Sequence, residues 1–532
     1  MNIWSNSKSK LKLKGLILTI LIGVSACASG AKSQLNYDRD LSQSSSLVTS
    51  ASLAESSRSL SPDFMCYNTN PLLFDSWTEP ALVKAVKQLK PRVLRFPGGT
   101  IADFWDWQRG GILADLSNIN ARQYPGIFRS SRVRQYTASK LEEVKAGLTA
   151  TQTKPLWVLN ILTSDLSSQL AMLRKARDLG INVDYIQIGN ETYFGLPDNL
   201  RLFPTSDDYA RLAREWTKAV KKEFPKAKVA VISPSHNYLE RGNRRDTRIQ
   251  FWNDSVLAIA LPESDAIAFH LYYDTNIIPN RRSETTYPFF TQEDVPIILS
   301  LPFFNWQKTK ANSQFQAVSN SKEIWITEYN IMESLEPMEG SSPKLIGTWS
   351  HGLQNITLSL LFLEDSRINL ICNHVLVGTS QFGAILADEK QIGINSFINP
   401  SQPMKAAPFG LSASGSALRL LGEVIENMTE ARKINFSTNP MVTVKNQFKY
   451  PSLQGWLFNN SLERRAIIIN LSSEVVEVNI DSVFDKSVDY EQVSGHPRDL
   501  VAKPGILEES KGTASKQIQL PAYSVTKLSS LR

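Results

Sequence analysis

The sequence has little of what several common classes of site require. Its 532 residues include three cysteines and five histidines. Three cysteines are too few for a disulfide-stapled scaffold, and no Cys/His cluster has the spacing of metal ligands. A His-Glu-x-x-His pair, a Walker loop, a Gly-x-Gly-x-x-Gly turn and a Gly-x-Ser-x-Gly elbow are all absent. These absences remove the usual sequence signals for a zinc protease, a nucleotide-binding domain and an α/β-hydrolase.

The sequence also lacks a strong excess of charge. Lys+Arg 58 against Asp+Glu 51 gives a formal net charge of +7. Four of the positive charges (Lys8, Lys10, Lys12 and Lys14) lie in an acid-free stretch through residue 26, so the rest carries about +3, from 7 − 4. That excess is too small for the dense basic stripe that binds nucleic acid. Hydrophobic and charged contents of 42% and 20% are ordinary for a soluble globular protein, and the length predicts more than one domain.

The N-terminus is predicted to be an export signal. An apolar run of about nine residues, 16–24, follows the four lysines. It is too short to cross a bilayer, which takes roughly 20 residues. A basic head, a short apolar run and small residues after it are typical of a secretory signal peptide, here residues 1–26.

The end of this signal has a second feature. Val24-Ser25-Ala26-Cys27 resembles the lipobox of bacterial lipoproteins. The resemblance implies that Cys27 is lipidated and that the protein is exported to the cell envelope, with a lipid anchor as its only membrane contact. The alternative is ordinary signal-peptide cleavage after Ala26-Cys27-Ala28, which would give a soluble, secreted protein. Residues 27–61 are rich in serine and poor in aromatics, which predicts a solvated tether.

Short apolar runs alternate with helical patterns across residues 62–428. Apolar runs bounded by turn residues predict buried strands, and amphipathic stretches at 80–90, 168–180, 206–224 and 347–365 predict helices. The strand candidates are Phe64–Tyr67, Val93–Phe96, Leu156–Ile161, Tyr185–Ile188, Val229–Ile232, Ala266–Leu271, Ile324–Thr327 and Ile368–Asn373. Eight strands with helical or long connections predict a (β/α)8 TIM barrel. The alternative, an open doubly wound sheet, usually has a glycine-rich first turn, which is missing here.

The pattern changes in residues 429–532. Short segments of alternating polarity, such as "RAIIINLS" and "VVEVNID", are separated by Asn, Ser and Gly turns. This spacing predicts an antiparallel β-sandwich as a second domain.

Polar residues gather where the predicted barrel strands end. They are Arg95 on the second strand, Asn190 and Glu191 after the fourth, His270 and Tyr272 on the sixth, and Glu328 after the seventh. Because functional residues of such barrels lie at the carboxyl ends of the strands, the two glutamates are expected to share one mouth. Two facing carboxyls suit glycoside hydrolysis, in which the protonated one donates to the leaving oxygen and the ionised one attacks the anomeric carbon. A gap of roughly 5–5.5 Å predicts retention of configuration, and about 6.5–9.5 Å predicts inversion.

Four motifs at these strand ends carry a family resemblance. "VLRFPGG" (93–99), "YIQIGNE" (185–191), "FHLYY" (269–273) and "WITEYN" (325–330) together resemble clan A of the glycoside hydrolases. The similarity covers roughly residues 62–425, and the closing "LPAYSVTKL" is similar to the β-sandwich often fused to such barrels. The resemblance implies a retaining (β/α)8 enzyme with Glu191 as general acid/base and Glu328 as nucleophile. This chemistry requires neither a metal nor an organic cofactor.

The resemblance also implies roles for the neighbouring side chains. Arg95 would hold Glu328 ionised and oriented, since a positive partner lowers the pKa of a carboxyl. Asn190 would bond the 2-hydroxyl of the sugar, a contact that strengthens in the transition state. His270 and Tyr272 lie two residues apart, so both would face the lumen and line the sugar site.

The sugar itself is indicated less strongly. "LRFPGG" followed by an aromatic-x-Trp pattern resembles α-L-arabinofuranosidases, which usually have Asn where this chain has Thr100. "GGT" followed by "ADF" instead resembles heparanase-like β-glucuronidases. A tryptophan is frequent at the end of the eighth strand in the clan, whereas this chain has His374 there. The arabinofuranosidase resemblance is preferred, with the β-glucuronidase as the alternative.

Two other functions remain open at this point. A non-catalytic surface lipoprotein could bind polysaccharide in the same groove, and a transglycosylase could pass the same covalent intermediate to a sugar hydroxyl. In every case the expected partner is carbohydrate, with no nucleic acid. The sequence sets no oligomeric state.

Some residues near the predicted site have structural interpretations instead. Trp325 is an odd number of residues from Glu328 and should face the outer helices as core. Trp105 and Trp107 could either stack on sugar rings or pack the barrel mouth. Cys66 and Cys372 fall on the first and eighth strands, which are neighbours in a closed barrel. A disulfide is possible there, but two buried thiols are the preferred prediction.

Overall fold

A computed structural model describes most of the chain after residue 46. The described residues are 47–70, 76–112, 139–235, 247–274, 291–332, 345–378, 382–387, 408–444 and 448–531. The predicted signal peptide (1–26), the lipidation site Cys27 and residues 28–46 of the predicted tether lie outside them. Within the described ranges, no helix combines the length and the apolar character needed to cross a membrane.

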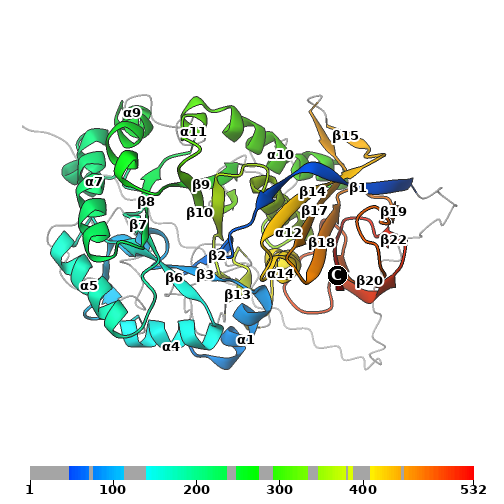
Figure 1. Cartoon of the computed structure of the whole chain (residues 1–532), viewed down its shortest axis with the longest axis horizontal. Helices are drawn as coiled ribbons and strands as arrows, with labels where there is room; N and C mark the ends of the chain where they lie inside the picture. The colour runs from blue at the N-terminus through cyan, green and yellow to red at the C-terminus, as the bar shows by residue number, and fades with distance from the viewer. Residues whose placement is uncertain are drawn as a thin grey trace, which may run out of the picture. The chain divides into compact units, whose positions relative to one another are not determined.

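Eight parallel strands close into a barrel (Figure 1), which confirms the predicted TIM barrel. In chain order the strands are β2 (Met65–Asn68), β3 (Val93–Phe96), β6 (Lys154–Leu159), β7 (Tyr185–Ile188), β8 (Lys228–Ser233), β9 (Ala266–Asp274), β10 (Glu323–Met332) and β11 (Ile368–Asn373). Each pairs with the next, and β11 pairs with β2 to complete the ring. Each predicted strand corresponds to one of these eight, because buried parallel strands are apolar on both faces and stand out as short continuous runs.

Helices surround the barrel in the connections between strands. They are α1 (Pro80–Leu89), α4 (Leu141–Thr151), α5 (Leu166–Asp178), α6 (Pro197–Leu202), α7 (Ser206–Glu223), α9 (Thr247–Ser255), α10 (Val295–Ala311), α11 (Ser313–Gln316), α12 (Trp349–Phe362) and α14 (Ala413–Ile425). α7 begins at a capping box in which the side chains of Thr205 and Asp208 each bond the backbone N–H of the other residue. Its buried Tyr209 hydroxyl donates to the carbonyl of Ile188 and accepts from the N–H of Ile232. The helix therefore fixes the ends of β7 and β8, where the candidate site begins.

The C-terminal region forms a nine-stranded sheet, separate from the barrel sheet, in the order β21-β20-β23-β18-β17-β14-β1-β19-β22. Its strands are β14 (Glu430–Phe436), β17 (Leu453–Asn459), β18 (Glu463–Asn470), β19 (Val476–Asn479), β20 (Val488–Ser494), β21 (Glu508–Ala514), β22 (Gln517–Leu520) and β23 (Ser524–Leu531), joined by one from the N-terminal side. Strands from both ends of this order line one apolar core, so the sheet curves around it as two layers. This is the predicted antiparallel second domain.

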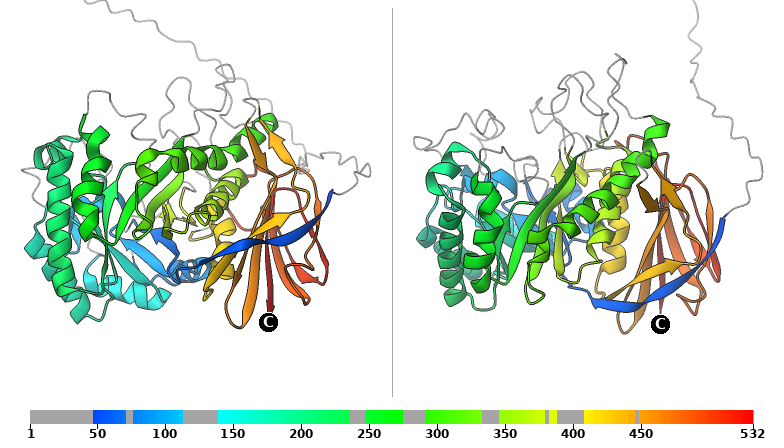
Figure 2. Two further views of the ribbon diagram at one scale, coloured as in Figure 1. Left: turned by 45° about the horizontal axis from the view of Figure 1, so that its top comes forward. Right: turned by 90° about the horizontal axis from the view of Figure 1, so that it is seen from above.

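The ninth strand corrects the predicted tether. β1 (Leu47–Ser59) lies inside the C-terminal sheet, between β14 and β19, as Figure 2 shows. It pairs antiparallel with β14 and parallel with β19, with a register shift between Leu53 and Ser57. The serine-rich composition was misleading, because alternate β1 residues such as Ala51 enter the apolar core while the serines face outward.

The barrel and the sheet share one continuous core that runs through α12 and α14. Trp349 at the start of α12 donates its indole N–H to the carbonyl of Tyr523, 2.6 Å away, on the sheet side. The backbone N–H of the same tryptophan donates to the carbonyl of Asp499 at 2.8 Å. The second domain is therefore anchored by hydrogen bonds as well as by apolar packing.

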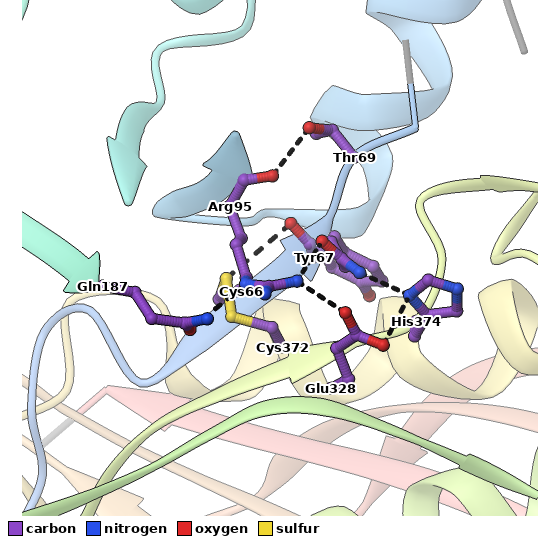
Figure 3. Close-up of a disulfide and its surroundings, with 9 residues drawn as sticks. Cys66, Tyr67, Thr69, Arg95, Gln187, Glu328, Cys372 and His374 are labelled. Carbon is purple, nitrogen blue, oxygen red and sulfur yellow. Dashed lines mark hydrogen bonds and ion pairs between the residues drawn. A yellow bond between two sulfur atoms is a disulfide. The ribbon is translucent and has the colours of Figure 1, made fainter. Parts of the chain in front are cut away.

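A disulfide joins Cys66 and Cys372 and corrects the prediction of two free thiols. The two residues are direct partners on β2 and β11, the pair of strands that closes the barrel. Both are fully buried, and Figure 3 shows the disulfide next to the guanidinium of Arg95. The prediction of thiols failed because strand adjacency places the residues next to each other but does not determine their oxidation state.

Trp325 also differs from its prediction. Its ring packs edge-on against Tyr185 with centroids 5.4 Å apart. Tyr185 is on β7, which is not adjacent to β10 in the ring, so the two rings meet inside the barrel. The register of β10 against β9 shifts between Ile326 and Glu328. A bulge of this kind breaks the alternation of faces, which places Trp325 and Glu328 both on the lumen side despite their odd spacing.

Candidate active site

The two predicted carboxyls meet at the carboxyl end of the barrel. Glu328 comes from β10, and Glu191 comes from the turn after β7. An oxygen of each lies within 4.8 Å of the other. The side chain of Glu328 is 4% exposed, whereas that of Glu191 is 19% exposed and reaches solvent. The site therefore holds one enclosed and one accessible carboxyl.

The turn that carries Glu191 is strained and held from outside. Glu191 has a φ of 48°, in the left-handed region that few non-glycine residues adopt. Such strain persists where the surrounding structure enforces it and is concentrated at functional sites. Arg248 on α9 enforces it by donating to the carbonyls of Thr192, Tyr193 and Phe194 at 3.0, 3.0 and 2.6 Å.

Arg95 is the fixed cation of the site. It is fully buried, and its Nη1 donates to Oε1 of Glu328 at 2.6 Å. The same Nη1 donates to Oδ1 of Asn68 at 3.0 Å, while Nη2 donates to Oδ1 of Asn190 at 2.7 Å and Nε to Oε1 of Gln187 at 3.3 Å. Figure 3 shows the guanidinium between Gln187 and Glu328. A buried Arg with four acceptors is locked in place, so it orients the carboxylate as well as neutralising it.

Glu328 is held as a carboxylate. Burial by itself would raise its pKa, but the neighbouring imidazoles and Arg95 oppose this, and the Tyr272 hydroxyl donates to Oε2 at 2.5 Å. The net effect lowers the pKa of Glu328 well below its ordinary value. Arg95 contributes to this lowering with a charge that does not titrate.

One buried donor of the site has no partner among the described residues. Nδ1 of His270 lies 2.8 Å from Oε1 of Glu191, while its Nε2 is unpaired. Asn190 accepts from Arg95 through Oδ1, and its side chain also interacts with the carboxyl of Asp103. Buried polar atoms in proteins nearly always have partners, and exceptions accompany catalysis or a missing ligand.

All six predicted site residues thus lie together, and the structure adds three more. Asn68 at the end of β2 and Gln187 on β7 bond Arg95, and Nδ1 of His374 after β11 lies 3.4 Å from Oε2 of Glu328. Asn68 is packed so closely that a Cβ at Gly98 would fall 1.9 Å from its Oδ1, which explains the glycine. The signal that could have found Asn68 and His374 is their position at the ends of the first and eighth strands.

A third carboxyl lies beside the pair. Asp103, on the turn after β3, is 5% exposed, and its side chain interacts with Asn190. Burial, together with the charge of nearby Glu191, raises the pKa of Asp103 well above its ordinary value. These surroundings favour the protonated form of this carboxyl.

The two candidate sugar-stacking tryptophans pack instead of lining the carboxyl pair. Trp105 is buried and meets Phe96 edge-on with centroids 4.9 Å apart. Trp107 is half-buried, donates to Oγ of Ser168 at 3.1 Å and lines a separate cavity of about 440 Å³ near Lys140.

The arrangement can support acid–base and nucleophilic chemistry. A buried carboxylate fixed by Arg95 can act as a nucleophile, and an accessible carboxyl within 4.8 Å can exchange a proton with solvent. Glu191, His270 and Glu328 also offer ligand atoms close enough together to hold a metal ion. The hydrogen bonds from Arg95 and Tyr272 already occupy both oxygens of Glu328, which disfavours a cation there.

No protein-family model and no curated protein sequence matches the chain. Solved structures do match. A family 51 α-L-arabinofuranosidase from Bifidobacterium longum has a TM-score of 0.65 at 14% identity, covering 91% of this chain and 99% of that one. The α-L-arabinofuranosidase of Thermotoga maritima has a TM-score of 0.60 at 16% identity, covering 91% of this chain and 100% of that one. A 4-O-α-L-rhamnosyl-β-D-glucuronidase from Fusarium oxysporum has a TM-score of 0.53 at 11% identity, covering 91% of this chain and 100% of that one. The chain therefore has the two-domain fold of clan A glycoside hydrolases of the arabinofuranosidase type, as the motifs indicated.

Proposed function

We propose that this protein is a retaining glycoside hydrolase that uses Glu328 as nucleophile and Glu191 as general acid/base. The observation that carries the proposal is the pair of carboxyl oxygens within 4.8 Å of each other. Retaining glycosidases have carboxyl groups about 5–5.5 Å apart, whereas inverting ones need about 6.5–9.5 Å to admit a water. The different surroundings of the two carboxyls support the division of roles.

In the first step, an oxygen of Glu328 attacks the anomeric carbon. The bond from that carbon to the glycosidic oxygen breaks, and Glu191 gives its proton to the departing oxygen. In the second step, water attacks the same carbon, Glu191 takes a proton from the water, and the bond to Glu328 breaks. Two inversions give net retention, and both glutamates return to their starting states.

The surrounding side chains support these steps. Arg95 and Tyr272 together fix both oxygens of Glu328, which leaves a lone pair free to attack. His270 keeps Glu191 in place at 2.8 Å. The amide of Asn190, which Arg95 holds through Oδ1, is suited to donate to the sugar 2-hydroxyl, where a hydrogen bond gains strength in the transition state.

The substrate is proposed to be a poly- or oligosaccharide with an α-L-arabinofuranosyl group. Support comes from the "RFPGG" turn and from the two arabinofuranosidases of the same fold. The alternative is a β-glucuronide, which the "GGTIADF" stretch and the glucuronidase neighbour favour.

We also propose that the protein is exported and is anchored through Cys27. The signal-like residues 1–26 support export. The disulfide between Cys66 and Cys372 adds an independent argument, because disulfides persist in oxidising compartments outside the cytosol. Mass spectrometry of the mature N-terminus tests this proposal: an unmodified Cys27 would contradict lipidation, and an intact Met1 would contradict export.

A panel of nitrophenyl glycosides tests the enzyme proposal. It should include the arabinofuranoside, glucuronide, xyloside and glucoside, with NMR detection of the first-formed anomer. Hydrolysis with retention, lost in Glu328→Ala, is the expected result. Inversion would exclude a covalent intermediate on Glu328. Added acceptor sugars that divert the product would instead identify a transglycosylase.

The non-catalytic alternative makes the opposite prediction for Glu191. A protein that only binds polysaccharide would behave the same after Glu191→Gln. The proposed enzyme should lose activity most strongly on substrates with poor leaving groups, because these depend on the proton that Glu191 supplies.

A further inference from the structure

The geometry around His374 fixes which of its ring nitrogens carries hydrogen. Oδ1 of Asn68 accepts from Arg95 at 3.0 Å, so the amide of Asn68 turns its oxygen toward the guanidinium and its nitrogen toward His374. The amide nitrogen is a donor only, and it bonds Nδ1 of His374. Nδ1 must therefore accept, which leaves the hydrogen of a neutral imidazole on Nε2.

The surroundings disfavour the charged form of this ring. Burial lowers the pKa of His374, and although Glu328 opposes this, Arg95 and His270 act in the same direction as burial. Nδ1 lies 3.4 Å from Oε2 of Glu328 but is already engaged with Asn68, so it does not form a charged pair with the carboxylate. Other titratable groups that act on this ring include Glu191, across the site.

The opposite edge of the ring points away from Glu328 (Figure 3). The side chain is 23% exposed, which makes it the most open of the groups around Glu328. Tyr272 and Phe382 hold it edge-on, with centroid separations of 5.7 and 5.8 Å. Among the described residues none accepts a hydrogen bond from Nε2. Gly99, whose φ of 65° lies in the left-handed region, packs beside Cε1 of this ring, where a Cβ would fit at 3.9 Å.

We propose that His374 is a specificity-determining residue whose Nε2–H donates to an oxygen of the bound sugar on the side away from Asn190. In the closed barrel β7 and β11 lie four strands apart, on opposite sides of the lumen. Asn190 follows β7 and His374 follows β11, so a sugar seated over Glu328 meets the two side chains at opposite edges. The inference rests on the proposed glycosidase function, and it assigns a hydrogen-bond donor to a substrate position remote from the 2-hydroxyl.

The tautomer can be tested without any activity. Long-range ¹H–¹⁵N NMR of the protein labelled at histidine distinguishes a pyridine-like from a pyrrole-like nitrogen, and comparison with His374→Gln assigns the signal. The expected result at pH 7 is a pyridine-like Nδ1 and a pyrrole-like Nε2. A cationic ring, or hydrogen on Nδ1, would overturn the inference.

The contact with substrate is tested by three variants and a control. The amide nitrogen of glutamine reaches the position of Nε2, whereas that of asparagine reaches only the position of Nδ1. On whichever panel glycoside the wild type hydrolyses, His374→Gln should stay within about fivefold of the wild-type kcat/KM. His374→Asn and His374→Phe should lose about 10- to 100-fold, mainly through KM, as expected for one lost hydrogen bond. His496→Gln, in the C-terminal domain, is the control for a remote histidine.

The outcomes separate this inference from the proposed function. Equal losses in all three His374 variants, with unchanged thermal midpoints, would mean that the ring only packs, and would overturn the inference. Unchanged activity in Glu328→Ala would instead overturn the proposed function, whatever the His374 variants do. If the wild type hydrolyses no panel glycoside, the NMR result at Nδ1 and Nε2 still decides whether the donor exists.

Discussion

Two buried glutamates in this chain look alike locally but belong to different machinery. Glu328 is in the barrel lumen, and Glu491 is on β20 at the contact between the sheet and α14. Both are at most 5% exposed, and cationic neighbours lower the pKa of both despite burial, to about 2 in the case of Glu491. A low pKa in a buried glutamate is therefore not enough to identify a catalytic carboxylate.

The difference lies in the balance of charges around each one. Glu491 pairs with Arg419 at 2.8 Å, Lys527 at 2.9 Å and Lys511 at 3.3 Å, and it shares the first two with Glu423. At this contact the two carboxylates, Glu423 and Glu491, are therefore paired with three cationic side chains.

Around Glu328 the balance is reversed. In the described part of the chain, Arg95 is the one permanent cation in contact with Glu328, and Glu191 is a second carboxyl within 4.8 Å. A site with more carboxyls than cations favours holding a proton, and this proton is what an acid catalyst gives away. The comparison teaches that surplus carboxyls, together with the unpaired donor of His270, distinguish the proposed active site from the structural cluster.

The largest expected effect separates the two glutamates by activity. Glu328→Ala should lower kcat/KM on the order of 10⁴-fold or more, because the nucleophile is lost. Glu491→Gln should leave kcat/KM within about threefold but destabilise the protein by about 3 kcal/mol, since it leaves buried cations unpaired. Steady-state kinetics and denaturant unfolding measure the two effects. A large loss of activity in a folded Glu491→Gln protein would break the comparison.

The next effect concerns the cations. Arg95→Lys should lower kcat/KM by about 10²- to 10³-fold, because lysine cannot reproduce four planar hydrogen bonds. The weaker partner also lets the pKa of Glu328 rise toward its ordinary value. The carboxylate is then lost earlier on acidification, so the acid limb of the pH profile moves to higher pH. Arg419→Lys is the matched control, and its pH profile should coincide with that of the wild type.

The third prediction compares how the two regions are stabilised. Cys66→Ser combined with Cys372→Ser should lower the free energy of unfolding by about 2–5 kcal/mol, because the disulfide closes a long loop in the unfolded chain. The sequence separation across the bond is 306 residues. Reduction of the wild type should give the same shift in denaturant unfolding, and no further shift in the double variant. Unfolding curves that coincide with and without reductant would show that the bond does not form.

The smallest effect is the pH dependence of stability. Glu491 has a folded pKa of about 2 against an ordinary value of 4.5. The contribution of the ionised Glu491 to the free energy of unfolding is therefore complete above about pH 5 and is lost as the pH falls toward 2. Glu491→Gln should make the thermal midpoint depend less steeply on pH in this window. An unchanged slope would mean that other carboxyls account for the acid sensitivity.

Much of the fold followed from local sequence patterns. The eight barrel strands are short apolar runs because both their faces are buried, and this can be recognised without knowing their neighbours. The six predicted site residues lie together because all of them stand at or just after strand ends of one barrel. Three further residues of the cluster were not predicted, because their places in it depend on contacts between different strands. They are Asn68 and Gln187, which bond Arg95, and His374, which lies beside Glu328.

Other features depended on partners distant in the chain. The strand β1 is serine-rich, and it is a strand because β14 and β19 border it. Trp325 faces the lumen because a bulge in β10 shifts the alternation of its faces. The bond between Cys66 and Cys372 required two strands at opposite ends of the barrel sequence to meet.

The sequence by itself determined the elements of this protein, the barrel class, and the residue types available at the strand ends. The tertiary structure alone decided which carboxyl is enclosed, which is accessible, and how far apart they lie. The physical reason is the sequence distance over which each effect acts. The pattern of apolar residues that forms a strand or helix involves only a few neighbouring residues. The protonation of a carboxyl depends on charges and solvent brought to it from strands more than a hundred residues away.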